Sequence, residues 1–391
     1  MHRGVLFVAA LSALAVFGSS RAVVASPTGS AALIELGRSL FFDASLSEPA
    51  GTSCASCHAP ARGFSSTNGS KLGVPRGSRA GHFARRASPS LLYLRYVPPF
   101  RFFQEGDEPG TAPAGGLFWD GRVDGIEALA RQPLLNPDEM NGKDGATIAE
   151  KIARGGYADA FERAFPAALK NPEATLRSVG AALSAFLLTD DMAPFSSKFD
   201  DVVRGKDRFT PLEAEGLRLF KDQNKGACAS CHLVDEAAHD PTASLFTDYG
   251  YDAVAAPLND KIPASPTPDL GLCERTDPVT PSSEPMYCIN FRTPSLRNVA
   301  IRQSFMHNGG FADLRDVVAF YATRTTDARR WYRSGVPFDS VPAKYRHQVN
   351  VGAAPYNRHA GDPPALTDPE IDAIVAFLGT LTEKRYLAPR P

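Results

Sequence analysis

The five-residue segment Cys-Ala-Ser-Cys-His occurs twice in the chain, at residues 54–58 and again at residues 228–232. Two thiols at this spacing on one turn can each form a thioether bond to a vinyl group of a haem, and the histidine that follows can bind the iron. A redox Cys-x-x-Cys pair or half of a zinc site would explain the cysteines, but not a histidine directly after both pairs. The repeat therefore predicts two covalently attached haem c groups, bound through Cys54 and Cys57 and through Cys228 and Cys231, with His58 and His232 as iron ligands.

The first residues have the pattern of a targeting segment. An early charge, Arg3, is followed by an apolar run from Val5 to Val16 and by small residues up to Ala25. This pattern is typical of a secretory signal peptide over residues 1–25, and it is too short for a membrane span. No later stretch is apolar enough to cross a bilayer. We therefore expect a protein exported to the bacterial periplasm, where haem c is attached after export.

The charges of the chain are balanced. Lys and Arg number 42 and Asp and Glu number 43, which gives a formal net charge of −1. Loss of Arg3 and Arg21 with the signal peptide changes this charge to −3. Nucleic acids and anionic lipid surfaces are bound by an excess of basic residues. The composition therefore predicts neither a nucleic-acid partner nor a membrane partner.

Four of the six cysteines belong to the two haem segments, and Cys273 and Cys288 remain. In an oxidising compartment such an even pair most simply forms a disulfide, here closing a short loop rich in Pro and Ser. Closing a loop of this length stabilises the fold by about 3 kcal/mol. A redox-active pair is the alternative that the sequence leaves open.

The two haem segments lie in two similar halves of the chain. Gly-x-x-Leu-Phe precedes each of them, at residues 37–41 and 216–220, and Ala-Phe-Leu follows, at residues 185–187 and 376–378. In each half, this pattern therefore predicts a helix, a haem loop, a long irregular segment and a closing helix. The fold class that we predict is mostly α, with two tandem class I cytochrome c-like domains, long loops and a haem in each domain.

Helix signals support this plan. Thr-x-x-Glu patterns begin at Thr147, Thr210 and Thr367 and predict helix starts there. A charged stretch before Thr210 places the boundary between an N-terminal haem domain of residues 26–205 and a C-terminal haem domain of residues 206–391. Two apolar stripes at helical spacing predict closing helices that pack across the haem faces: Leu176, Val179, Leu183, Phe186 and Leu187, and Ile371, Ile374, Val375, Leu378 and Leu381.

Motifs around both haem segments carry a resemblance to a known family. Pro-Ser-Leu-Arg-Asn at residues 294–298 and His-Asn-Gly-Gly at residues 307–310, followed by an apolar helix, resemble the C-terminal half of the bacterial diheme cytochrome c peroxidases and the MauG-type diheme oxidases. Leu-Phe-Phe-Asp at residues 40–43, Phe-Trp-Asp-Gly-Arg at residues 118–122 and Asn-Pro-x-Glu-Met at residues 136–140 are similar to the N-terminal half. The resemblance covers nearly the whole mature chain, with the motifs in order.

The sixth ligand of the second iron separates two chemistries within that family. In the peroxidases a Met at the end of the helix after the His-Asp-Gly motif binds this iron, whereas a Tyr stands there in the MauG-type proteins. Counting without gaps from residues 295–298 places Tyr321 at this position, and Met306 is the alternative. The resemblance therefore implies a phenolate ligand, which favours the higher oxidation states of iron and lets the haem hold oxidising equivalents.

The haem bound to His58 is, by resemblance, the site of reaction with hydrogen peroxide. Cleavage of the O–O bond needs a group that moves a proton between the two oxygens, and the resemblance offers Glu139 for that role. A solvated acid at a helix start is the alternative reading of Glu139. A Gln that the family carries ten residues earlier falls on Leu129, so the hydrogen bonding of this pocket departs from the family pattern.

Two further residues have roles only by resemblance. A loop histidine caps the resting iron of the peroxidases and leaves on reduction, and His82 is the only histidine between His58 and His232. The alternative is a surface histidine; the protein should then react with peroxide without prior reduction. Trp119 is placed between the two haems, where an indole can relay electrons, and the alternative is a tryptophan of the core.

The resemblance also implies a possible calcium ion and an electron donor. Family members often hold calcium between the domains through an Asn side chain, and that position falls on Tyr93, which leaves only carbonyls and water as calcium ligands. The implied electron donor is a small periplasmic cytochrome c or a cupredoxin, or else an oxidised protein substrate. The sequence leaves the oligomeric state open, a homodimer included.

The leading hypothesis is therefore a periplasmic diheme oxidoreductase that reacts with hydrogen peroxide at the N-terminal haem. Electrons or oxidising equivalents would be shared with the C-terminal haem through Trp119. A MauG-like enzyme that oxidises side chains of a protein is one alternative. A diheme electron-transfer cytochrome with both irons six-coordinate is the other, and an open, high-spin iron would exclude it.

Overall fold

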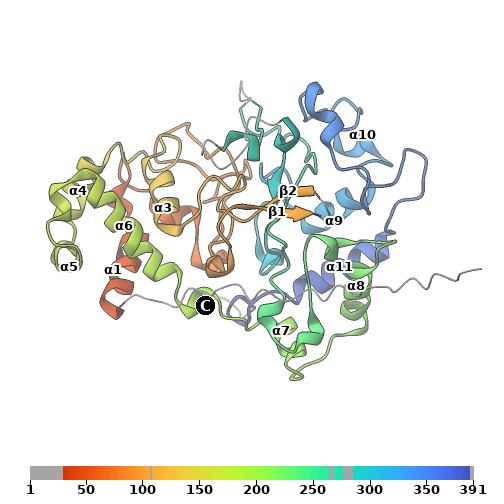
Figure 1. Ribbon diagram of the computed structural model, residues 1–391, viewed down its shortest axis with the longest axis horizontal. Helices are drawn as coiled ribbons and strands as arrows, with labels where there is room; N and C mark the ends of the chain where they lie inside the picture. Colours follow the sequence, from red (N-terminus) through yellow and green to blue (C-terminus); the bar gives the residue numbers. More distant parts are fainter. Residues whose placement is uncertain (1–29, 106–107, 264–267, 276–284, 388–391) are drawn as a thin grey trace, which may run out of the picture.

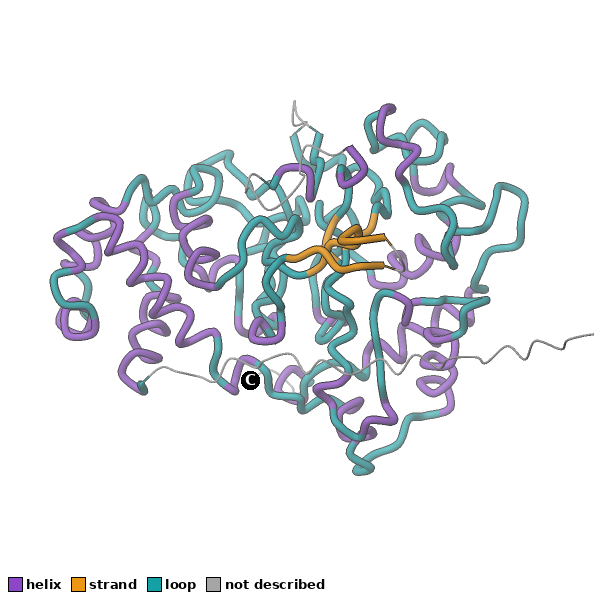
Figure 2. Tube along the Cα trace, viewed as in Figure 1, coloured by secondary structure: helices purple, strands orange, loops and turns teal. Residues whose placement is uncertain are grey.

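The computed structural model describes residues 30–105, 108–263, 268–275 and 285–387, so the predicted signal peptide lies outside the described residues. Figure 1 shows one group of helices from the first half of the chain and a second group from the second half, with short strands between them. Long loops, teal in Figure 2, connect these elements. The fold is mostly helical, as predicted, and its two halves have the cytochrome c-like plan.

The elements follow one another in chain order. The first half contains α1 (Ala31–Phe42), α2 (Cys54–Cys57), α3 (Ile126–Leu135), α4 (Gly145–Arg154), α5 (Ala158–Ala164) and α6 (Pro172–Leu187). After it come α7 (Lys198–Val203), α8 (Pro211–Lys221), α9 (Leu314–Thr323), α10 (Ala328–Trp331) and α11 (Asp368–Gly379). Two antiparallel strand pairs are formed by β1 (Arg101–Glu105) with β2 (Glu108–Ala114), and by β3 (Tyr251–Asp252) with β4 (Phe291–Arg292).

The internal duplication is visible in two equivalent helix crossings. α1 packs on α6 and α8 packs on α11. A Cβ atom on Gly37 of α1 would lie 2.0 Å from the carbonyl oxygen of Ala182, and a Cβ atom on Gly216 of α8 would lie 2.0 Å from that of Ala373. Since only glycine allows such close approach of two backbones, the Gly-x-x-Leu-Phe repeat marks the same crossing in both halves.

Two of the three predicted helix starts are confirmed. Thr210 and Thr367 form capping boxes at the starts of α8 and α11. The start predicted at Thr147 is wrong, because α4 begins at Gly145. Its N-cap is Asp144, three residues before Thr147, and the Asp144 side chain accepts a hydrogen bond from the Thr147 N–H. Aspartate is at least as good an N-cap as threonine, so the earlier residue with the free carboxylate starts the helix.

The hydrophobic core consists of two main clusters. One surrounds α1 and α6 and extends to Phe195, and the other surrounds α8, α9 and α11 and includes Phe199 and Val203. α7, which the sequence analysis assigns to the first domain, therefore packs with the second cluster. The charged stretch that suggested the boundary, residues 200–207, begins inside α7, where Asp200 is buried, and only residues 204–207 are exposed.

Cys273 and Cys288 form the predicted disulfide. It ties the segment before residue 275 to the segment that leads into β4. No helix within the described residues has the length and apolar character needed to cross a bilayer.

Candidate functional site

The two Cys-Ala-Ser-Cys-His segments adopt closely similar turns. The backbone N–H of His58 donates to the carbonyl of Cys54 at 2.9 Å, and that of His232 donates to Cys228 at 2.8 Å. The first turn is the helix α2 and the second is a 3-10 helix over Cys228–Ser230. Each turn therefore presents two thiols and an imidazole close together, the arrangement that haem attachment requires.

A second contact orients each imidazole. The Nδ1–H of His58 donates to the carbonyl of Phe64 at 3.0 Å, and the Nδ1–H of His232 donates to that of Phe246 at 2.9 Å. Both phenylalanines have a left-handed backbone, with φ of +55° and +54°. Such a bond fixes the tautomer and leaves Nε2 free for a metal. Burial also lowers the pKa of His58 to about 4 and lowers that of His232, so both rings are neutral, as iron ligation needs.

The attachment cysteines do not behave as thiolates. Burial raises the pKa of all four thiols to about 12: Cys54, Cys57, Cys228 and Cys231. Zinc binding and disulfide exchange both use the thiolate. Bound zinc would itself lower the pKa of these thiols, so it is the histidine after each pair that favours haem attachment over both alternatives.

Each attachment segment lines a cavity of its own. The first cavity, about 330 Å³, contains His58 in its wall, and the second, about 1390 Å³, contains His232. The predicted apolar stripes contribute to both walls: Leu183 and Leu187 of α6 in the first, and Ile374 and Leu378 of α11 in the second. The closing helices therefore lie where they were predicted, across the two cavities.

The surroundings of Arg302 indicate whether these cavities suit a haem. Its guanidinium lines the second cavity, its Nη2 donates to the carbonyl of Ser88 at 3.2 Å, and its buried Nε has no hydrogen-bond partner in the described chain. Burial lowers its pKa to about 10. Since an uncompensated buried cation is costly, the site calls for an anion, and the carboxylate of a haem propionate would supply one. Nothing in the sequence singled out Arg302.

Glu139 lies in the wall of the first cavity. It follows the end of α3 in a turn and does not start a helix, so the alternative reading of this acid is wrong. Burial raises the pKa of its carboxyl, while Arg122 and Asn136 act in the opposite direction. A raised pKa favours return of the proton after the carboxylate has accepted it, as a general acid–base group requires.

The remaining wall of the first cavity is largely apolar. Leu129 of α3 lines it at the position where the family has a Gln, and Gln132 is exposed on the same helix. Phe118 and Arg122 face the cavity as well. Met140 also lines it, and sequence reasoning did not identify Met140 or Arg122 as parts of this wall.

Trp119 is buried and lines both cavities. Its Nε1 donates to the carbonyl of Ala87 at 2.8 Å, and its own carbonyl accepts from the N–H of Arg292 in β4 at 2.8 Å. The N–H of Ala87 in turn donates to the carbonyl of His307 at 2.8 Å. Trp119 is therefore held by both halves of the chain in the wall between the two cavities.

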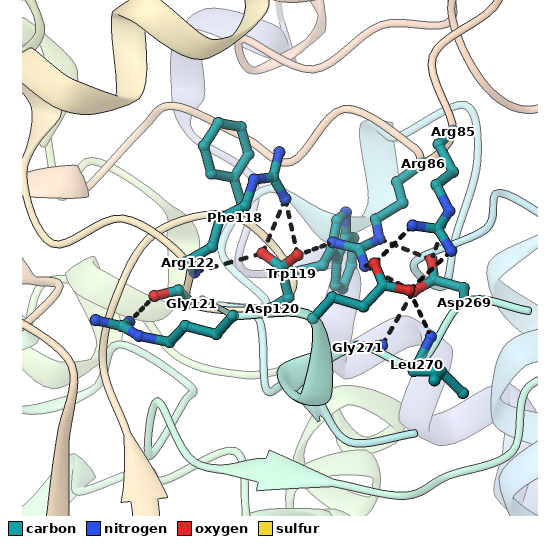
Figure 3. A network of polar contacts seen from close by, with 12 residues as sticks. Arg85, Arg86, Phe118, Trp119, Asp120, Gly121, Arg122, Asp269, Leu270 and Gly271 are labelled. Atoms are coloured by element: carbon teal, nitrogen blue, oxygen red, sulfur yellow. Dashed lines mark hydrogen bonds and ion pairs between the residues drawn. The ribbon is translucent and has the colours of Figure 1, made fainter. Parts of the chain in front are cut away.

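An ionic network surrounds Trp119 (Figure 3). Arg86 bridges Asp120 of the first half and Asp269 of the second, with N–O distances of 2.6 Å to each. Arg85 pairs with Glu274 at 2.6 Å. We call these five residues the interdomain network. Because its carboxylates come from both halves, it fixes the position of the wall that carries Trp119.

Tyr321 and Met306 both line the second cavity, together with His232. The Tyr321 ring stacks on Tyr356, with 5.7 Å between the ring centroids. No hydrogen bond of the described residues uses the Tyr321 hydroxyl, although a buried phenol usually has a partner. Tyr356 lies in a Pro-containing loop without a motif, so no sequence pattern pointed to it. The hydroxyl of Tyr321 is thus available to a ligand in the cavity.

His82 is not part of either cavity wall. Its Nδ1 lies 2.8 Å from Asp138 and 3.1 Å from Arg79, and its side chain is 36% exposed. The structure therefore does not bring His82 to the cavity that contains His58.

Tyr93, at the family's calcium position, is buried between the halves. Its hydroxyl donates to the carboxylate of Glu383, which also accepts from the Ser196 N–H at 2.6 Å. The guanidinium of Arg297 lies 5.1 Å from the Tyr93 ring centroid. The side chain at this position is thus engaged by the protein itself.

Comparisons with known proteins agree with this geometry. A family model described as di-haem cytochrome c peroxidase matches residues 31–208. The methylamine utilization protein MauG of Paracoccus denitrificans is 35% identical over 367 residues, which cover 91% of this chain and 89% of that protein. The cytochrome c551 peroxidase of Nitrosomonas europaea is 27% identical over 296 residues, covering 73% of this chain and 71% of that protein.

A solved structure extends the match. The diheme peroxidase BthA of Burkholderia thailandensis superimposes with a TM-score of 0.87 at 47% sequence identity, over 94% of this chain and 91% of that chain. The chain therefore belongs to the family of di-haem cytochrome c peroxidases and MauG, whose members are oxidoreductases with two c-type haems that act on hydrogen peroxide.

Proposed function

We propose that this protein acts in the periplasm and reduces hydrogen peroxide in the first cavity, with electrons delivered through the second. Hydrogen peroxide takes up two electrons and two protons and leaves as two water molecules. The observation that carries the proposal is that both cavities share Trp119 and that the wall of the first contains Glu139, a half-buried acid whose pKa is raised by burial.

The proposal assigns the haem-binding residues by position. The thiols of residues 54, 57, 228 and 231 form the thioethers, His58 and His232 bind the irons, and Tyr321 completes the second site, with Met306 as the alternative. Haem iron, when bound, supplies the redox centre at which the O–O bond is cleaved. Arg302, which lines the second cavity, would neutralise a haem propionate there.

The protein's own residues then have separate tasks. Glu139 takes the proton from one peroxide oxygen and returns it to the other, which leaves as water. Leu129 and Phe118 limit the access of water to this cavity. Trp119 lies in the wall between the cavities, and its indole relays electrons between them.

Two sources of electrons fit this arrangement. The first is a small redox protein, a cytochrome c or a cupredoxin, in a reaction that removes peroxide. The second is the side chains of a protein substrate. Tyr321 in the wall of the second cavity favours it, because a phenolate ligand lets an iron retain oxidising equivalents. The 35% identity to a MauG protein also supports this second candidate.

The test is stoichiometric hydrogen peroxide added to the fully ferric protein, with optical and EPR spectra before and after. We expect a high-spin ferric signal from an open first site, then rapid loss of the ferric signals and a long-lived oxidised form of the protein. A resting protein with only low-spin iron, as ligation by Met140 would produce, and without a reaction in either redox state, would support the electron-transfer cytochrome instead.

His82 gives a separate prediction. Because its side chain is bonded to Asp138 outside the first cavity, we expect His82→Ala to leave the rate of the ferric protein with peroxide unchanged within about twofold. Stopped-flow mixing of ferric wild type and variant with peroxide measures this. A wild type that reacts only after reduction, and a variant that reacts without it, would identify His82 as a cap on the iron.

A further inference from the structure

We infer that Arg122 is a second catalytic residue of the first cavity: its guanidinium donates hydrogen bonds to peroxide and to the anion that forms as the O–O bond breaks. This inference rests on the proposed function, because it requires that peroxide binds in the first cavity. It assigns a task to a side chain that the sequence motif at residues 118–122 contains but does not explain.

Arg122 and Glu139 lie in the wall of the same cavity. Both line the first cavity, and the positive charge of Arg122 lowers the pKa of Glu139, against the larger effect of burial. Leu129, Ala130 and Pro133 of α3 supply an apolar part of the wall. Leu129 cannot donate a hydrogen bond at the position where the family has an amide. The amide of Asn136, at the end of α3, also lines the cavity but acts on Glu139 itself, whereas Arg122 brings a charged donor from a different segment.

The guanidinium of Arg122 is held before any ligand arrives. Its Nη1 lies 2.9 Å from both carboxylate oxygens of Asp120, and its central carbon lies 3.7 Å from the centroid of the Phe118 ring. Figure 3 shows Arg122 beside Phe118, with Asp120 between Arg122 and Arg86. Asp120 is itself 2% exposed and bound by Arg86. The interdomain network thus positions Arg122, and a donor fixed in advance stabilises developing charge most effectively.

Arg122 retains donors for a ligand. A guanidinium has five N–H groups, and within the described chain the side chain of Arg122 uses only Nη1 in hydrogen bonds. Arg86, in the same network, uses Nε, Nη1 and Nη2 on carboxylates. The two arginines therefore differ in role: Arg86 joins the halves, whereas Arg122 lines the first cavity and makes no hydrogen bond through Nε or Nη2 within the described chain.

The chemistry of peroxide cleavage needs such a donor. As the O–O bond breaks, its electron pair goes to the departing oxygen, which carries negative charge until Glu139 returns the proton and water leaves. The two electrons come from the redox protein or the protein side chains named above. Without a nearby cation, this charge would develop against the apolar wall at Leu129. A single preorganised donor of this kind contributes about 10²- to 10³-fold to a rate.

The test uses fluoride, a small anion that binds an open ferric haem and accepts hydrogen bonds from neighbouring donors. Ferric wild type, Arg122→Leu and Arg122→Lys are titrated with sodium fluoride and followed by their optical and EPR spectra. Arg131→Leu is the matched control, since Arg131 is an exposed arginine of α3 that pairs with Glu173. We expect Arg122→Leu to weaken fluoride binding by about 10- to 100-fold, the effect of one charged hydrogen bond.

The fluoride affinity of Arg122→Lys should lie between those of the wild type and Arg122→Leu, because lysine keeps the charge but lacks the planar array of N–H donors. Arg122→Lys also keeps the test valid if Arg122→Leu does not fold. Fluoride affinity unchanged in both variants, with or without a shifted reduction potential, would overturn the inference and leave the proposed function intact. A wild-type protein without an open site for fluoride would overturn both.

Discussion

Glu139→Gln should slow the reaction of the ferric protein with hydrogen peroxide by about 10²- to 10⁴-fold, the usual contribution of a general acid–base group. The amide has nearly the shape of the carboxyl group but cannot take a proton from the peroxide. Stopped-flow absorbance with peroxide in excess measures the second-order rate constant. Glu150→Gln is the matched control, because Glu150 is exposed on α4 and pairs with Arg154.

The pH dependence provides an independent readout. Glu139 must be a carboxylate to accept a proton, and burial raises its pKa above the ordinary value. The wild-type rate should therefore fall as the pH decreases through this raised pKa, at a higher pH than for an exposed glutamate. Glu139→Gln should lose this acidic limb. A variant with the wild-type rate and pH profile would show that another group transfers the proton.

The second large effect is expected at Tyr321. Tyr321→Phe should convert the second iron from six- to five-coordinate and abolish the long-lived oxidised form, since the phenolate is lost. Tyr321→Met should raise the reduction potential of this haem, on the order of a few tenths of a volt, because a thioether is neutral and favours the reduced iron. EPR spectra and a potentiometric titration measure both changes.

Two control variants separate the alternatives for this ligand. Met306→Leu removes the other candidate ligand in the second cavity, and Tyr356→Phe keeps the ring that stacks on Tyr321. If Tyr321 is the ligand, both controls should retain the wild-type spectrum of the second haem. A changed coordination in Met306→Leu, with none in Tyr321→Phe, would reverse the assignment.

Much of the fold could be predicted because its signals are local or repeated. Thr210 and Thr367 start helices through contacts within one turn, and the two glycine positions recur because the same helix crossing is built twice. The failure at Thr147 is equally local, since Asp144 is a competing cap three residues earlier. The position of α7 was missed for a different reason: its burial depends on α8 and α11, which lie later in the chain.

The residues around the cavities also divide into those that local motifs identify and those that only contacts between distant segments reveal. Glu139 and Trp119 were identified because they stand in motifs with a known resemblance. Arg302 and Tyr356 were missed, since their functional setting consists of contacts with distant segments, such as Ser88 for Arg302 and Tyr321 for Tyr356. The task inferred for Arg122 likewise required its contacts with Asp120 and Phe118 and its place beside Glu139.

The sequence by itself determined that this chain carries two haem-attachment segments in two similar halves, because thioether spacing and helix capping are set within a few residues. Only the tertiary structure decided that Trp119 is shared by both cavities, that Arg86 joins carboxylates from both halves, and that His82 stays outside the first cavity. Those contacts join residues far apart in the chain. Their geometry follows from how the two halves pack, which no short motif encodes.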